Sequence, residues 1–334
     1  MEKKSTLLIM ILSKTPFRIS LIGGGSDLPS FYKNSGGAVI SMSINKYIYI
    51  SLHQKFDKGY RISYSKTENC QTLEQIKHDI VRESVRYSEV IDNLEITSIA
   101  DIPAGTGLGS SSSFAVGLTN ALLKYSKASS SKKKLAEIAC NIEINILNKP
   151  IGKQDQYAAA FGGLNLIEFT KNGPISVHPL TLNHNTKEEM FGRFLLFHTG
   201  GVRSANNILK EQVFNLENDK KHSDLTRSLV SLTYELHNQL QNNNINDIGN
   251  ILDQGWQIKK NLSSNISNEY INNIYDKAIE AGAQGGKLLG AGSSGFILLY
   301  ADKKFHTSIR NTLGLHEVEF DLEQQGSKII YCNN

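Results

Sequence analysis

A glycine-rich loop with four consecutive serines is the part of the sequence whose residue types point most directly to chemistry. It reads Pro103-Ala-Gly-Thr-Gly-Leu-Gly-Ser-Ser-Ser-Ser-Phe-Ala-Val-Gly117. Glycines let a backbone approach a phosphate closely, and the free N–H groups and dipole of a helix N-terminus attract an anion. Serine hydroxyls add donors, and one of them can ligate Mg²⁺. The loop is therefore a candidate phosphate site.

The segments on either side of this loop decide between a phosphate site and a flexible Ser/Gly linker or a simple serine cap. Residues 94–97 alternate apolar and polar side chains, which predicts a half-buried strand before the loop. After the loop, apolar residues recur at helical spacing: Phe114, Leu118, Ala121, Leu122 and Tyr125. This strand–loop–helix order favours the phosphate site. The two common nucleotide fingerprints do not fit, because no lysine follows the last glycine and Ser110 replaces the final glycine of G-x-G-x-x-G.

Strand and helix signals are mixed along the whole chain, which predicts an α+β protein. A second helix carries apolar residues on one face and must stop near Pro150: Leu135, Ile138, Ala139, Ile142 and Ile146. We expect further strands at 17–22, 38–40, 47–52, 193–197 and 296–300, helices at 71–87, within 205–262 and at 270–283, a linker at 181–189, a helix–helix connection at 241–250 and a glycine-rich turn at 285–295. Two domains are expected, residues 1–185 and 186–334.

Composition excludes several other functions. The 334 residues are 40% hydrophobic and 20% charged, which is typical of a globular chain with room for two cores. A net charge of +4 without a basic block argues against nucleic acid. Three distant cysteines predict no disulfide framework, and the nine histidines form no metal-ligating cluster. No segment is apolar enough to span a bilayer, residues 1–12 are expected to be an extension, and we expect a cytoplasmic protein.

Glu143 lies between Ala139 and Ile146 on the apolar face of the second helix. Its carboxylate is therefore expected to be partly buried, which is costly without a partner. Binding of Mg²⁺ would neutralise the charge. A structural salt bridge is the alternative.

Three sequence motifs, in order, resemble those of the GHMP kinases, the family of galactokinase, homoserine kinase, mevalonate kinase and phosphomevalonate kinase. The serine loop resembles the family's ATP-binding motif. Residues 15–27, Thr-Pro-Phe-Arg-Ile-Ser-Leu-Ile-Gly-Gly-Gly-Ser-Asp, resemble its N-terminal motif, and residues 287–300 its C-terminal glycine motif. The glycine triplet followed by Ser-Asp is similar to the branch with D-glycero-D-manno-heptose 7-phosphate kinases and fucokinases, as are residues 152–163 and 198–205.

This resemblance implies a fold and a reaction. The fold would have an N-terminal domain like domain 2 of ribosomal protein S5 and a ferredoxin-like C-terminal domain, with the active site between them. The reaction would transfer the γ-phosphoryl of MgATP to the anomeric hydroxyl of D-glycero-D-manno-heptose 7-phosphate, for nucleotide-activated heptose and surface polysaccharide. The alternatives are another sugar 1-kinase of fucokinase or galactokinase type, and a non-catalytic sugar- or nucleotide-binding regulator. A homodimer is left open.

The resemblance also assigns roles to single residues. Asp155 matches the acidic residue beside the acceptor hydroxyl, with a helix cap as the alternative, and Arg18 the basic residue of the first motif, with an exposed strand-edge arginine as the alternative. Ser111 and Glu143 match the Mg²⁺ ligands. The ATP-binding residues would be Pro103, Ala104, Gly105, Thr106, Gly107, Leu108, Gly109, Ser110, Ser111 and Ser112. The sugar phosphate would contact Gly24, Gly25, Ser26, Asp27, Gly292 and Ser293, with Arg203 or Lys153 on its phosphate.

Overall fold

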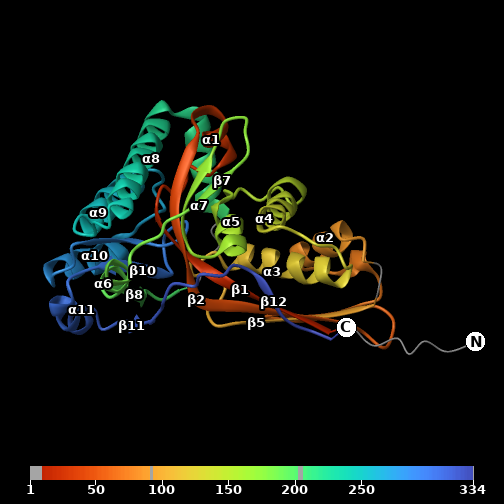
Figure 1. The fold of residues 1–334 in the computed structure, drawn as a ribbon. Coiled ribbons are helices and arrows are strands. Elements are labelled where there is room, and N and C mark those ends of the chain that lie inside the picture. Colours follow the sequence, from red (N-terminus) through yellow and green to blue (C-terminus); the bar gives the residue numbers. More distant parts are fainter. Residues whose placement is uncertain (1–9, 91–92, 202–205, 334) are drawn as a thin grey trace, which may run out of the picture.

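The computed structural model describes residues 10–90, 93–201 and 206–333 (Figure 1). Two sheets, both covered by helices, make up the fold, which confirms the α+β prediction. The larger sheet has the order β12-β1-β2-β5-β3-β4, with β6 and β7 continuing from the first half of β2. Its strands are β1 Met10–Ile22, β2 Gly37–Gln54, β3 Tyr60–Ser63, β4 Thr67–Cys70, β5 Leu94–Ala100, β6 Leu164–Phe169, β7 Ser176–Pro179 and β12 Lys328–Cys332.

β1 and β2 form a long antiparallel pair that organises the larger sheet. The first half of β2 also pairs with β6, and its second half pairs with β5. The two short strands expected at 38–40 and 47–52 are therefore one continuous strand. The expected N-terminal extension is also wrong for its last residues, because Met10, Ile11 and Leu12 pair with β2.

Helices α2 to α5 gather around α3, which packs on β1 and β2. The apolar residues that predicted α3 are all buried. Gly117 faces the sheet closely, since a Cβ there would lie 2.7 Å from Oγ1 of Thr15. The helical segments in this part of the chain are α1 Pro29–Ser35, the 3₁₀ turn Leu73–Gln75, α2 Asp79–Tyr87, α3 Ser110–Tyr125, α4 Lys132–Cys140 and α5 Gln154–Phe161. The helix expected at 71–87 is therefore split by residues 76–78.

The predicted second helix changes geometry at its end. After α4 the chain continues as a π-helical segment, Asn141–Ile146. The wider turn of a π-helix shifts the faces on which later side chains lie. Ile142 and Glu143 are consequently buried, whereas Ile146 is 40% exposed, in contrast to its expected position on the apolar face. π segments are often found at functional sites.

The smaller sheet is antiparallel throughout and has the order β11-β8-β10-β9. Figure 1 shows α10 and α11 beside it, with α9 next to α10 and α8 extending further from α9. Its strands are β8 Phe194–His198, β9 Gly285–Leu288, β10 Phe296–Tyr300 and β11 His316–Glu317; the helices are α6 His184–Phe191, α7 Asn206–Asn218, α8 Lys220–Gln241, α9 Ile248–Lys259, α10 Glu269–Glu280, the 3₁₀ turn Lys303–Phe305 and α11 His306–Leu313.

Two segments differ from the expected connections. The segment expected as a linker contains α6, which is capped by Asn183 and buries Met190. The turn expected at 285–295 begins only at Leu289, because Gly285–Leu288 forms β9. The division at residue 185 remains a prediction, but the larger sheet also contains β12, from the end of the chain. Within the described residues, no helix combines the length and apolar character needed to cross a bilayer. Cys70 and Cys140 are buried free thiols.

Candidate active site

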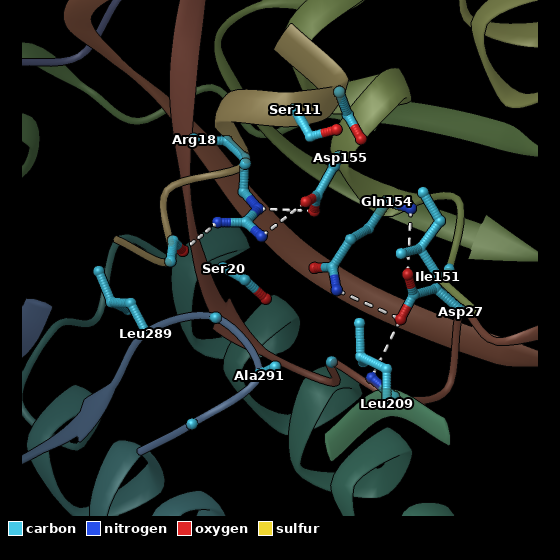
Figure 2. A pocket seen from close by; sticks show the side chains of 18 of the residues that line it. Arg18, Ser20, Asp27, Ser111, Ile151, Gln154, Asp155, Leu209, Leu289 and Ala291 are labelled. Carbon is cyan, nitrogen blue, oxygen red and sulfur yellow. Dashed lines mark hydrogen bonds and ion pairs between the residues drawn. The ribbon is translucent and has the colours of Figure 1, made fainter. Parts of the chain in front are cut away.

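The three glycine-containing motifs meet around one cavity of about 430 Å³. The serine loop and the N-terminus of α3 form one wall, the start of α5 and the glycine triplet after β1 form a second, and residues 289–294 after β9 form a third (Figure 2). A volume of this size is typical of small-molecule sites. The cavity lies between the larger sheet and the smaller one, where the active site was expected.

The N-terminus of α3 opens into the cavity without a side-chain cap. Gly109 is its N-cap residue and has a φ of 76°, a conformation that glycine adopts readily. The first N–H groups of a helix have no partner within the helix, so those of Ser110 and its neighbours are available for an anion. Of the ten residues expected to bind ATP, Gly105, Gly107, Gly109, Ser110, Ser111 and Ser112 line the cavity.

The other four of these ten residues do not line the cavity. Thr106 and Leu108 are buried, and the hydroxyl of Thr106 donates a hydrogen bond to the carbonyl of Pro103. Pro103 and Ala104 are exposed beside the cavity. Direct contact with a nucleotide is therefore expected from the residues at 105, 107 and 109–112.

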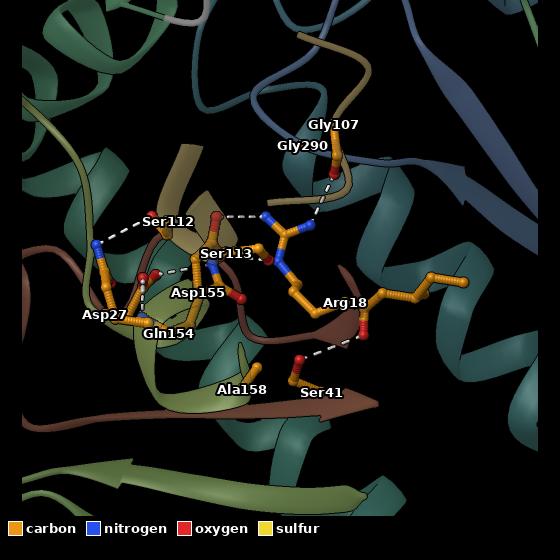
Figure 3. A network of polar contacts seen from close by, with 12 residues as sticks. Arg18, Asp27, Ser41, Gly107, Ser112, Ser113, Gln154, Asp155, Ala158 and Gly290 are labelled. Carbon is orange, nitrogen blue, oxygen red and sulfur yellow. Dashed lines mark hydrogen bonds and ion pairs between the residues drawn. The ribbon is translucent and has the colours of Figure 1, made fainter. Parts of the chain in front are cut away.

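Arg18 and Asp155 form the central ion pair of the site (Figure 3). The guanidinium donates from Nε to Oδ1 of Asp155 at 2.7 Å and from the NH2 nitrogen to Oδ2 at 2.8 Å. It also donates to the carbonyl of Gly107 at 2.7 Å, which ties β1 to the serine loop. Such a two-point contact fixes the orientation of a carboxylate. The pair therefore holds one carboxylate and one cation directly in front of the N-terminus of α3.

Both alternatives for this pair are wrong. Asp155 lies in the first turn of α5, whose N-cap is Lys153 and has no side-chain hydrogen bond, so the aspartate is not the cap. Arg18 is 5% exposed, so it is not a surface residue of a strand edge. The side chain of each instead contributes to the cavity wall.

Glu143 is fully buried and lies beside Ser111. The Ser111 hydroxyl donates to its Oε1 at 2.9 Å, and the amide of Gln156 donates to its Oε2 at 2.7 Å. Burial raises the pKa of Glu143, while Lys149, at 3.8 Å from Oε1, acts in the opposite direction. The π segment places this carboxylate at the cavity wall.

This donor set fits Mg²⁺, which prefers oxygen ligands. Glu143 supplies a carboxylate and Ser111 a hydroxyl, and Oε1 of the neighbouring Gln156 has no hydrogen-bond partner. The salt bridge to Lys149, which was the alternative, is also present, so both interpretations of Glu143 stand. No group of three or more histidine, cysteine or acidic residues suited to a metal occurs among the described residues.

Asp27 is buried in the cavity wall that the glycine triplet and the start of α5 form, and its carboxylate accepts three N–H hydrogen bonds. They come from the backbones of Gly25 and Gln154 and from the side-chain amide of Gln154. Burial raises its pKa, and the nearby charge of Asp155 raises it further. Gly152 must be a glycine here, since a Cβ would lie 1.8 Å from Oδ2 of Asp27. Gly24 and Gly25 line the same region.

Ser26 does not belong with these substrate candidates. It is fully buried, its hydroxyl donates to the carbonyl of Ala38 at 3.0 Å, and it accepts from the amide of Ala38 at 3.1 Å. Both hydrogen bonds fasten the glycine triplet to β2. We correct the assignment of Ser26 from substrate contact to structural support.

We expect Ser26→Ala to lower the free energy of unfolding by about 1–3 kcal/mol, because the amide of Ala38 loses its Ser26 acceptor and the carbonyl of Ala38 keeps only the long contact from the Thr233 hydroxyl, at 3.4 Å. The KM values for both reactants should stay within about twofold of the parent. Thermal unfolding and steady-state kinetics check the two statements. A large rise in KM with an unchanged melting temperature would restore Ser26 as a substrate contact.

The other residues expected to contact the substrate also fall into two groups, those that line the cavity and those that do not. Gly292 lines the cavity, whereas Ser293 does not and its neighbour Ser294 does. Lys153 lies outside the lining, with its ammonium 5.3 Å from the ring centre of Tyr32. Arg203 lies outside the described residues.

The two glycine loops contact each other across the cavity. Gly290 has a φ of 74°, and a Cβ on it would lie 2.5 Å from the Cα of Gly107. Gly290→Ala should therefore separate the loops and raise the KM for ATP by about tenfold or more. Gly314→Ala is the matched control, since Gly314 has a φ of 58° and no atom near its missing Cβ. Both variants should lose about 1 kcal/mol of stability from the positive φ, but an equal effect of both on the KM would contradict the loop contact.

Comparisons with known proteins agree with this geometry. Two family descriptions match the chain, "GHMP kinases N terminal domain" over residues 73–163 and "GHMP kinases C terminal" over residues 236–306. A D-glycero-alpha-D-manno-heptose 7-phosphate kinase of Campylobacter jejuni is 29% identical over 95% of this chain and 98% of its own length. A bifunctional fucokinase/GDP-fucose pyrophosphorylase of Arabidopsis thaliana is 26% identical over 92% of this chain but only 31% of that protein.

A solved structure titled as a D-glycero-D-manno-heptose 1-phosphate kinase from Bacteroides thetaiotaomicron shares the fold. It superposes with a TM-score of 0.80 over 97% of this chain and 100% of that chain, at 24% sequence identity. The uncapped N-terminus of α3 facing the Arg18–Asp155 pair is an arrangement suited to phosphoryl transfer. The chain belongs to the GHMP kinases.

Several residues of the cavity wall were not identified from the sequence, and two of them are buried lysines. Lys259, at the end of α9, and Lys287, in β9, both line the cavity and are buried. Lys287 stands within the quoted C-terminal motif, which was a signal that could have indicated it. A lysine at the end of an amphipathic helix ordinarily lies in solvent, so the sequence around Lys259 gives no such signal.

Proposed function

We propose that this protein transfers the γ-phosphoryl group of ATP to the anomeric hydroxyl of D-glycero-D-manno-heptose 7-phosphate and forms the 1,7-bisphosphate. The observation that carries the kinase chemistry is the Arg18–Asp155 pair in front of the α3 N-terminus. The relative from Campylobacter jejuni supports the heptose phosphate as acceptor, since it matches 95% of the chain. The product would feed the synthesis of nucleotide-activated heptose for surface polysaccharide.

In this proposal the residues of the chain orient the two reactants and stabilise charge. The N–H groups of Ser110 to Ser112 hold the phosphates of ATP, since phosphoryl transfer depends mainly on positioning and charge neutralisation. Asp155 accepts or orients the proton of the attacking hydroxyl, and Arg18 offsets negative charge on the transferring group. Asp27 accepts hydrogen bonds from sugar hydroxyls. Mg²⁺, where Ser111 and Glu143 hold it, would neutralise phosphate charge.

A coupled assay of ADP release tests the acceptor. The acceptors are heptose 7-phosphate, heptose 1-phosphate, heptose, fucose, galactose, mevalonate and homoserine. We expect kcat/KM to be at least about 100-fold higher for heptose 7-phosphate than for any unphosphorylated sugar, because buried groups that bind a phosphate stay unpaired without it. Phosphorus NMR of the product should show one phosphate on the anomeric carbon. Turnover of none of these acceptors would reject the proposal.

A fucokinase-type reaction is the second candidate. The specific observation in its favour is the match to the fucokinase of Arabidopsis over 92% of this chain. Asp27 and the glycine triplet can bind sugar hydroxyls whether or not the sugar carries a phosphate. A higher kcat/KM for fucose than for heptose 7-phosphate would establish this candidate instead.

A further inference from the structure

Lys259 and Lys287 are two buried lysines that share one side of the cavity. Only 9% of Lys259 and 6% of Lys287 is exposed, and both residues belong to the cavity wall. They come from α9 and β9, elements that pack against each other. Buried lysines are rare without a partner, because removal of an ammonium group from water is costly.

The partners of these lysines are backbone carbonyls. Nζ of Lys287 donates to the carbonyl of Leu21 at 3.0 Å. Nζ of Lys259 donates to the carbonyl of Gly290 at 2.6 Å, with the carbonyl of Leu288 at 3.5 Å. Among the residues that the structure describes, no carboxylate oxygen lies within 4 Å of either ammonium. Because an ammonium group has three N–H donors, each lysine retains donating capacity toward the cavity.

The other cations that line the cavity are already paired with carboxylates, whereas Asp27, which acts on Lys259, has only N–H groups as its partners among the described residues. Arg18 is paired with Asp155, and Lys149 lies between Asp79 and Glu143. Burial and the nearby Arg18 lower the pKa of Lys259 to about 8, although Asp27 acts in the opposite direction. Burial lowers the pKa of Lys287 further, and the charges of Lys259 and Arg18 add to this. Both shifts disfavour the charged ammonium, and an anion placed between the two lysines would favour the charged form of each.

We infer that Lys259 and Lys287 form a second anion site, separate from the serine loop, that binds a phosphate monoester. This inference rests on the proposed function, because it supplies that reaction with a site for a phosphate group outside the nucleotide loop. The phosphate can be the one that the acceptor already carries or the one that is being transferred. If the phosphate belongs to the acceptor, this lysine pair replaces Lys153, which lies outside the cavity lining, as the candidate cation for that phosphate.

The first experiment measures anion binding without any sugar. Inorganic phosphate is titrated by calorimetry into the protein with its nucleotide loop saturated by MgADP. We expect Lys259→Met and Lys287→Met each to weaken phosphate binding by at least about tenfold. Lys260→Met is the matched control, since this neighbouring lysine lies over the ring of Trp256, outside the cavity lining, and should leave binding unchanged. Equal phosphate affinity in the parent and all three variants would overturn the inference.

The second experiment separates the two sources of the phosphate. If the lysines hold the phosphate of the acceptor, both variants should raise the KM for heptose 7-phosphate by about tenfold or more and leave the kinetics with heptose unchanged. If they hold the transferred group, kcat should fall equally with both acceptors. The parent protein could fail to phosphorylate heptose 7-phosphate while the two lysine variants still lose phosphate binding. That result would support the anion site and reject the proposed acceptor.

A structural role would give a different result. Lys287→Met removes the donor to the carbonyl of Leu21, so its folding is checked by circular dichroism and thermal unfolding. Lys287→Gln retains an N–H donor without the charge and serves where the methionine variant does not fold. A lower melting temperature with parental phosphate affinity in Lys287→Gln and Lys259→Met would assign both lysines to structure alone.

Discussion

Asp155→Asn is expected to lower kcat by about 10³-fold, because positioned acid–base groups contribute roughly 10²- to 10⁴-fold. Asparagine preserves the size of the side chain and one oxygen that can accept from Arg18, but it cannot accept a proton from the attacking hydroxyl. The affinity for ATP should stay within about threefold, since Asp155 lies in front of the serine loop and not within it. Single-turnover kinetics and equilibrium nucleotide binding measure the two quantities separately.

The control for this prediction is Asp253→Asn, which changes a carboxylate that accepts the hydroxyl of Tyr275 at 2.6 Å, outside the cavity lining. It should alter stability and leave kcat close to that of the parent. Near-normal turnover in Asp155→Asn would instead mean that this residue only orients Arg18. In that event Arg18→Met should have the larger effect, and the double variant should resemble Arg18→Met alone.

Glu143→Gln is expected to raise the Mg²⁺ concentration for half-maximal velocity by about tenfold or more. The substitution preserves shape but removes the charged ligand from a fully buried position. Direct binding of Mn²⁺ to the ADP complex, followed by electron paramagnetic resonance, gives a readout that does not depend on turnover. The stability of the protein without nucleotide should change little, because an amide is cheaper to bury than a carboxylate.

Lys149→Met distinguishes a metal ligand from a salt bridge. If Glu143 binds the metal, removal of the lysine 3.8 Å away should leave metal affinity unchanged or increase it, since a competing cation is lost. If the carboxylate is only the structural partner of Lys149, the two variants should lose similar stability and retain parental metal affinity.

Local sequence patterns predicted the elements around the serine loop because the relevant information is local. The spacing of Phe114, Leu118 and Ala121 is enough to define α3, and all three side chains are buried. The position of Glu143 was predicted in the same way, although the π segment that presents it leaves no simple periodic signature. The helix α6 was missed in spite of a readable cap at Asn183, because its composition is polar.

Local sequence patterns could not predict the contacts between distant segments of the chain. The hydroxyl of Ser26 has the same chemistry whether it faces a sugar or Ala38, and only the course of β2 decides between them. The burial of Lys259 depends on how α9 packs against β9. The two-point contact between Arg18 and Asp155, 137 positions apart, follows from the way β1 and α5 meet.

The pairing of β12 with β1 has a consequence for how the chain is made. Strand β1 acquires its outer neighbour only from residues 328–332, so the larger sheet stays incomplete until these residues have been made. An unpaired strand edge is a template for aggregation. Truncation before Lys328 should therefore leave the outer edge of β1 unpaired and make the larger sheet prone to aggregation.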